Sequence, residues 1–238
     1  KQSNGKIILE WGLRVLAKAQ RNVPIAALCL VILLCSCAKV LEHIIFKHLS
    51  VFLEENNLIN DRQHGFRKGF STVTQLLETV HDIAAILDRQ GQIDMIFLDF
   101  EKAFDRVSHP KLLAKLKPVL KNSTLTSWIE AYLSYRNQIV SIDNVQSDSR
   151  PVKSGIPQGC VLGPLLFLIF TDDIANDIPV YVKLFADGCI VYQEIRSADD
   201  QVLLNAALTK ISSWCAVWQI KINEKKTVAM TVTRKRLL

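Results

Sequence analysis

Apolar residues recur at helical spacing in several parts of the chain, and two of these parts carry clear start signals. Ser71 precedes a segment with one continuous apolar face, and Ser197 precedes a longer periodic segment, so both serines are predicted to be helix N-caps. The stretch 160–174 is almost entirely apolar, which favours a buried helix. The pattern as a whole predicts helices over 38–55, 71–90, from about 108 onward, over 124–135, 160–174 and 197–218.

Shorter apolar runs have the length of strands. Two of them flank Ala186-Asp187-Gly188, and an Asp-Gly step between extended apolar runs is a strong hairpin signal. Strands paired through hairpins, with helices interspersed, indicate an α+β fold with a largely antiparallel sheet. The predicted strands are 93–100, 138–143, 150–153, 180–185, 189–194, 220–223 and 227–233.

Residues 23–38 form an uncharged, mostly apolar run that follows a basic start. It is shorter than the roughly 20 residues that a membrane-spanning helix needs. We therefore expect a buried element and no stable membrane association, with an intracellular location, nuclear or cytoplasmic. Membrane association through this run is the alternative.

The charge balance favours a polyanionic partner, because 29 basic residues face 23 acidic ones and the formal charge is +6. Solvated surface is the alternative interpretation of each basic patch. Six cysteines without a C-x-x-C pair indicate a reducing compartment. The basic patches are 1–21, the set Lys111, Lys115, Lys117 and Lys121, and the tail 234–236.

Two aspartates stand where predicted strands end. Asp99 closes a buried apolar run, where an unpaired carboxylate is costly, and Asp187 lies at the predicted hairpin tip. If the two strand ends are neighbours, both carboxylates project into one cleft, and oxygen ligands suit Mg²⁺ or Mn²⁺. Aspartates beside turns also shape the turn itself, which is the structural alternative.

Five segments, in the right order, resemble the reverse transcriptases of non-LTR (LINE-like) retrotransposons. This resemblance implies right-hand polymerase fingers and palm, the palm having a small antiparallel sheet packed on helices, with the thumb absent. It implies RNA-directed DNA polymerase activity on an RNA template, a DNA primer and deoxynucleoside triphosphates, with two Mg²⁺ (or Mn²⁺) ions. The segments are QHGFRKG at 63–69, FLDFEKAFD at 97–105, SGIPQGCVLGP at 154–164, LFAD at 184–187 and INEKKT at 222–227.

The same resemblance implies a domain order and a role for each site residue. The fingers are expected at 1–92, with 1–38 divergent and apolar, the palm at 93–109 and 151–238, and a connection at 110–150. Asp99, Asp187 and the Phe100 carbonyl would hold the metal ions, and Lys226, or its neighbour Lys225, would be the general acid toward pyrophosphate. The expected nucleotide-binding residues are Phe104, which would exclude a 2′-hydroxyl, Gln158 and Gly159 along the nucleotide and template, and Arg67 and Lys68 on phosphates.

The chain departs from this family at Gly188, where the second aspartate of the hairpin is expected. A glycine in a two-residue turn tolerates positive φ, so we expect the hairpin to fold normally while metal binding is weakened. Asp105, Glu101 and Asp172 are the candidates to compensate. The expected result is an impaired or inactive polymerase, and a non-catalytic nucleic-acid-binding remnant is the alternative function.

A second departure lies at Val23, where the family has its fingers arginine within a tyrosine-arginine-proline-isoleucine-serine segment. The apolar run that follows Val23 is also longer than the corresponding path in the family. An insertion or a reading-frame scar would explain both departures. Together with the lack of endonuclease and thumb segments, they favour a fragment of a decayed element.

Overall fold

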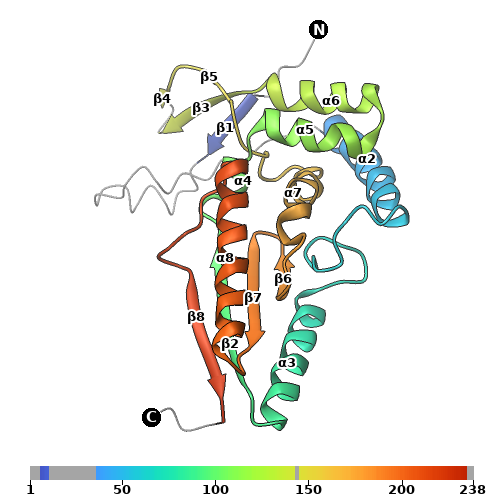
Figure 1. Cartoon of the computed structure of the whole chain (residues 1–238). Helices are drawn as coiled ribbons and strands as arrows, with labels where there is room; N and C mark the ends of the chain where they lie inside the picture. Colours follow the sequence, from blue (N-terminus) through green and yellow to red (C-terminus); the bar gives the residue numbers. More distant parts are fainter. Residues whose placement is uncertain (1–5, 11–35, 143–144, 235–238) are drawn as a thin grey trace.

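A computed structural model describes residues 6–10, 36–142 and 145–234 of the chain (Figure 1). Helices and strands are interspersed along it, and most of the predicted elements are confirmed to within a few residues. The helices are α2 (Ser36–Glu55), α3 (Thr72–Asp88), α4 (Ala103–Arg106), α5 (His109–Leu120), α6 (Ser123–Ser134), α7 (Gly163–Thr171), the 3₁₀ helix η2 (Asp172–Ala175) and α8 (Ala198–Trp218). The strands are β1 (Lys6–Glu10), β2 (Gln92–Asp99), β3 (Asn137–Ile142), β4 (Val145–Gln146), β5 (Arg150–Pro151), β6 (Tyr181–Phe185), β7 (Gly188–Glu194) and β8 (Val228–Thr233).

One antiparallel sheet has the order β6-β7-β2-β8, with Asp99 at the end of β2 and Asp187 in the turn between β6 and β7. The register of β2 against β7 pairs Ile93 with Glu194 at one end and Asp99 with Gly188 at the other. Because side chains alternate across a strand, Ile93, Met95 and Asp99 share one face of this sheet. The α+β architecture with an antiparallel sheet is therefore confirmed.

The two faces of this sheet are covered differently. Helix α3 packs over the Ile93 end of one face, where Ile93, Met95 and Tyr192 are fully buried. On the same face the Asp99 end is less covered, since Phe97 and Asp99 are only half-buried. Helix α8 packs on the opposite face, and Figure 1 shows it running along the sheet.

The main core is centred on α7, as the almost wholly apolar sequence of that segment predicts. Every residue of α7 except Pro164 is buried, because α5 packs against it and the sheet and α8 belong to the same apolar cluster. Figure 1 shows α5, α6 and α2 grouped at the end of the molecule near α7, away from β8.

A second, smaller sheet lies at that end and contains an element that the sequence pattern did not predict. Strand β1 pairs with β3 in parallel, with Lys6 opposite Asn137, and β3 also pairs with β4 and β5. The strand predicted at 220–223 is reduced to a single bridge between Ile222 and Phe100. Most of the apolar run 23–38 lies outside the described residues, and no helix among those described is long and apolar enough to cross a membrane.

Lys115 and helix α3 show that the sequence pattern alone does not decide which faces are exposed. Lys115, counted in a basic patch, is only 9% exposed and pairs with Asp173 beneath the rings of Trp214 and Trp218. The apolar face of α3 is exposed to solvent at residues that share helical spacing, while the helix buries its other face against the sheet. The exposed residues of α3 are Val73, Leu76, Leu77 and Val80.

Candidate functional site

Asp99 and Asp187 meet at one end of the antiparallel sheet. Asp99 is the last residue of β2, directly opposite Gly188, and Asp187 immediately precedes Gly188 in the turn between β6 and β7. The two aspartates therefore stand on neighbouring strand ends, as predicted from the sequence.

The turn itself differs in one detail from the prediction. Phe185 pairs with Gly188, so the two turn residues are Ala186 and Asp187, and Gly188 is already the first residue of β7. The left-handed residue is Ala186, with φ +53°, and the backbone conformation at Gly188 is one that any residue can adopt. The expectation that Gly188 uses positive φ is thus wrong.

A side chain at position 188 would belong to the same site. Paired residues of an antiparallel ladder point to the same face, so a residue at 188 would share the face of Asp99. A Cβ built on Gly188 lies 3.3 Å from the Phe185 carbonyl oxygen, a tight contact that requires the backbone to give by a few tenths of an ångström. A carboxylate at position 188 would therefore start on the face of Asp99, once the backbone has made this small adjustment.

The Asp99 side chain is held by a segment that follows α8. Asn223 donates from Nδ2 to Asp99 Oδ2 at 3.2 Å, and its backbone N–H donates to the Asp99 carbonyl at 2.8 Å. Lys226 Nζ lies 3.6 Å from Asp99 Oδ2 and is itself 70% exposed. The structure therefore brings Lys226 to Asp99, with Phe100 buried next to it.

The predicted nucleotide-binding residues Phe104, Gln158 and Gly159 lie in one connected region. Phe104 stacks on Phe167 of α7, with ring centroids 4.4 Å apart. Gln158 Nε2 donates to Asp105 Oδ1 at 3.1 Å, which joins the loop before α7 to the segment after β2. Gly159 has φ +85°, a conformation that glycine adopts without strain.

The other two predicted phosphate contacts, Arg67 and Lys68, differ sharply. Arg67 is 7% exposed in its side chain and donates to both carboxylate oxygens of Glu54, at 3.0 and 2.7 Å. It also donates to the backbone carbonyls of Asn60 and Gln63. Lys68 is exposed, so the two neighbours occupy different environments.

None of the three proposed compensating carboxylates completes a metal site. Each of them already has a partner. Asp172 accepts a hydrogen bond from the Asn60 backbone N–H at 2.6 Å, and Glu101 is ion-paired with Lys221. Asp105 accepts a hydrogen bond from the side-chain amide of Gln158. Among residues 6–10, 36–142 and 145–234, no three His, Cys, Asp or Glu side chains are grouped to hold a metal ion. Asp99 and Asp187 thus offer two carboxylates where position 188 would supply a third.

The sequence did not single out Gln63, which bonds to the Ala186 N–H, or Asn223, which bonds to Asp99. Gln63 is 3% exposed, and its Oε1 accepts from the Ala186 N–H at 3.0 Å. Both residues lie inside segments that resemble family motifs, so their presence in those motifs was the available signal.

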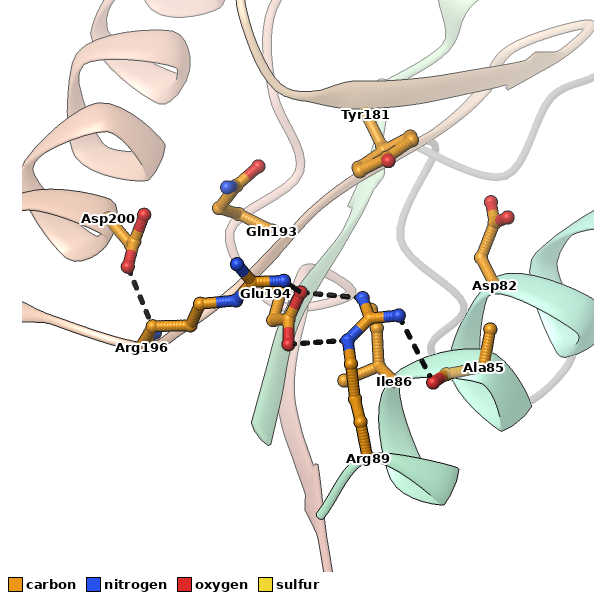
Figure 2. Close-up of a pocket in the computed structure, with 9 residues that line it drawn as sticks. All are labelled: Asp82, Ala85, Ile86, Arg89, Tyr181, Gln193, Glu194, Arg196 and Asp200. Carbon is orange, nitrogen blue, oxygen red and sulfur yellow. Dashed lines mark hydrogen bonds and ion pairs between the residues drawn. The ribbon is translucent and has the colours of Figure 1, made fainter. Parts of the chain in front are cut away.

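A hollow of about 380 Å³ lies at the opposite end of the β2–β7 ladder (Figure 2). There Glu194, which pairs with Ile93, accepts hydrogen bonds from both Arg89 and Arg196. These two guanidinium groups lower the pKa of Glu194 to about 2. Because each arginine is matched to this carboxylate, the hollow is a structural ion-pair cluster, separated from Asp99 by the length of the strand.

Comparison with known proteins shows the family of this chain. A family model described as reverse transcriptase (RNA-dependent DNA polymerase) matches residues 29–237. The chain is 31% identical over 214 residues to the probable RNA-directed DNA polymerase from transposon BS of Drosophila melanogaster, covering 86% of this chain and 24% of the relative. It is 33% identical over 210 residues to the corresponding protein from transposon X-element of the same organism, covering 86% of this chain and 23% of the relative.

The fold is also similar to solved telomerase structures. The apo telomerase of Candida tropicalis, truncated from its C-terminal domain, superposes with a TM-score of 0.61 at 11% identity, covering 84% of this chain and 42% of that one. The telomerase of Candida albicans in complex with a fragment of telomeric RNA superposes with a TM-score of 0.61 at 13% identity, covering 84% of this chain and 35% of that one. The chain spans about a quarter of the length of the curated relatives it matches. It belongs to the reverse transcriptase family and is a domain of the non-LTR retrotransposon type.

Proposed function

We propose that this domain is built for RNA-templated DNA synthesis, and that this copy is impaired because Gly188 replaces a metal-binding aspartate. The observation that carries the proposal is the strand register, which sets Asp99 opposite Gly188 and beside Asp187. In this register, a carboxylate at position 188 would be the third at this end of the sheet.

In the proposed mechanism, Asp99, Asp187 and the Phe100 carbonyl would hold divalent cations at this end of the sheet. Carboxylate oxygens are the ligands that Mg²⁺ and Mn²⁺ prefer, so the residues present fit such an ion, although fewer than a complete set. Such ions would supply activation of the primer 3′-hydroxyl and charge stabilisation of the leaving oxygen. Asn223 would orient Asp99 through its 3.2 Å hydrogen bond, and Lys226, whose Nζ lies 3.6 Å from Asp99 Oδ2, would donate a proton toward the departing pyrophosphate.

The substrate contacts follow from the same geometry. Phe104 has a fixed ring, since it stacks on Phe167, and a fixed ring is suited to limit the space beneath a sugar. Gln158 and Gly159 would lie along the nucleotide and template, and exposed Lys68 is better suited than Arg67 to contact phosphate. We assign the sheet β6-β7-β2-β8 to the palm and the segments before β2 to the fingers. The partners would be an RNA template, a DNA primer and deoxynucleoside triphosphates.

Primer extension on an RNA template tests the proposal, with Mg²⁺ and Mn²⁺ assayed separately. We expect Gly188→Asp to raise the rate about 10–100-fold, the range that loss of one supporting group commonly costs. Asp99→Asn in the Gly188→Asp chain is the control and should abolish the gain. Equal rates with and without Gly188→Asp would show that position 188 does not limit activity.

A second candidate function, nucleic-acid binding without catalysis, is favoured by the same missing carboxylate together with the net charge of +6. It predicts RNA or hybrid-duplex binding that weakens steeply with salt and is unaffected by a chelator. Binding that is retained in the chelator while Gly188→Asp gives no product would favour this function over the first.

A further inference from the structure

The loop between α2 and α3 pairs with the free edge of β6 through a single β-bridge. The Leu184 N–H donates to the Arg62 carbonyl at 2.8 Å, and the His64 N–H donates to the Leu184 carbonyl at 2.8 Å. Gln63 and Leu184 thus form a parallel bridge one step before the turn that carries Asp187. The loop is therefore attached to the strand that leads into the candidate site.

Gln63 extends this attachment into the turn itself. Its side-chain oxygen accepts two backbone hydrogen bonds, from Gly65 N–H at 2.7 Å and from Ala186 N–H at 3.0 Å. Ala186 is the residue with φ +53°, a conformation that costs an L-residue about 1–2 kcal/mol. The buried amide oxygen of Gln63 therefore stabilises the one strained residue of the turn.

Gly65 allows the loop to approach this closely. A Cβ at Gly65 would lie 2.4 Å from the Ala186 nitrogen, so any side chain there would push the loop away from the turn. The close approach and the shared Gln63 acceptor make loop and turn one rigid unit.

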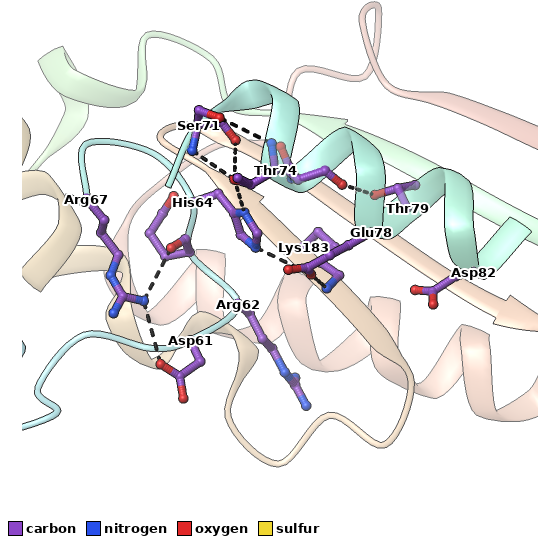
Figure 3. Close-up of polar contacts among 12 residues, drawn as sticks. Asp61, Arg62, His64, Arg67, Ser71, Thr74, Glu78, Thr79, Asp82 and Lys183 are labelled. Atoms are coloured by element: carbon purple, nitrogen blue, oxygen red, sulfur yellow. Dashed lines mark hydrogen bonds and ion pairs between the residues drawn. The ribbon is translucent and has the colours of Figure 1, made fainter. Parts of the chain in front are cut away.

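The far side of the loop is fixed to helix α3 (Figure 3). His64 is fully buried; its Nδ1 lies 3.1 Å from the Thr74 hydroxyl, and its Nε2 lies 3.6 Å from Glu78. Glu78 in turn pairs with Lys183 of β6. The loop thus links α3 to the turn, with Gln63 as its last contact before Asp187.

We propose that Gln63 is a positioning residue for Asp187. By holding the Ala186 N–H, it sets the turn so that the Asp187 carboxylate stands beside Asp99. The inference rests on the proposed function, in which these carboxylates bind divalent cations. Gln63 itself touches neither substrate nor metal.

The test measures Mn²⁺ affinity by electron paramagnetic resonance in the full chain carrying Gly188→Asp. Gln63→Met keeps the length of the side chain and removes the acceptor, and we expect it to weaken Mn²⁺ binding about tenfold or more. Gln63→Glu keeps an acceptor oxygen and should restore the affinity to within about twofold of the parent chain. Gln63→Asn retracts the acceptor by one methylene and should give an intermediate loss, which keeps the test decisive if Gln63→Met does not fold.

Gln75→Met is the matched control, because Gln75 is also buried but none of its hydrogen bonds in the described residues reaches the turn. It should leave Mn²⁺ affinity unchanged. Equal affinity of the parent and Gln63→Met, or equal losses in Gln63→Met and Gln75→Met, would overturn the inference.

Asp99→Asn distinguishes failure of the proposed metal site from failure of the Gln63 inference alone. If Asp99→Asn does not weaken Mn²⁺ binding, the proposed metal site fails and the inference fails with it. If it does, an unchanged Gln63→Met overturns the inference alone.

Discussion

The side chain of Arg67 offers the sharpest test of whether a family motif residue acts on substrate or on the fold. It forms a bidentate ion pair with Glu54 and donates to the Asn60 and Gln63 carbonyls. Its guanidinium carbon lies 4.5 Å from the centroid of the Phe70 ring. We predict that Arg67→Met destabilises the domain and that its effect on nucleotide affinity is secondary.

The magnitude follows from the burial of the two partners. Breaking a buried ion pair costs about 3–5 kcal/mol, because an unpaired charge is left behind. Exposed pairs contribute about 0–1 kcal/mol. Arg67 is 7% exposed and Glu54 32%, so Glu54 can be rehydrated once Arg67 is lost. An intermediate loss of about 2–3 kcal/mol in the free energy of unfolding is therefore expected.

Urea unfolding followed by circular dichroism measures this loss, and a double-mutant cycle with Glu54→Gln isolates the pair. We expect a coupling energy of about 1–2 kcal/mol, as for residues in direct contact. Lys68→Met is the matched control and should stay within about 0.5 kcal/mol, because Lys68 is exposed. An unchanged free energy of unfolding in Arg67→Met, with weaker nucleotide binding, would refute the reasoning and return Arg67 to the substrate site.

Two further predictions concern buried basic residues. Lys115→Met should lower the free energy of unfolding by about 2–3 kcal/mol. It removes the partly buried ion pair with Asp173 and the cation–π contact 3.8 Å from the centroid of the Trp218 ring. A urea midpoint equal to that of the wild type would contradict this prediction. Burial is the main cause that lowers the pKa of His109, whose Nε2 lies 2.8 Å from the Gly155 carbonyl. The unfolded chain therefore binds the proton more readily, and the stability that His109 contributes is full above about pH 6.5 and declines as pH falls toward the folded-state pKa. Urea midpoints at pH 7.5 and pH 5 should accordingly diverge less in His109→Gln than in the wild type, and equal divergence would refute this assignment.

Local signals in the sequence located most elements because they act over a few residues. Ser71 and Ser197 cap α3 and α8 as predicted, each within a reciprocal capping box. The apolar runs around Asp187 pair as a hairpin, and the pairing of β7 with β2 then brings Asp99 to the same sheet end. The sequence thus placed each aspartate at a strand end, and the β2–β7 pairing supplied the condition on which their adjacency depended.

What could not be predicted depends on packing between distant segments. The spacing of apolar residues found helix α3 but not its buried face, which includes Gln75 and Thr79. The basic character of Lys115 suggested a solvated face, yet its partner Asp173 lies 58 positions away. The periodic spacing of apolar residues predicts that a helix or strand exists, whereas tertiary contacts decide which of its faces is buried and against what.

The turn that carries Asp187 shows why fold and chemistry can separate in this domain. Its geometry depends on the register of β7 and on Gln63, which supports the strained Ala186. Neither contact involves the side chain at position 188. Under the proposed function, an aspartate at position 188 would add a metal ligand without altering either of these contacts. Gly188→Asp is therefore expected to restore the site while the hairpin keeps its register.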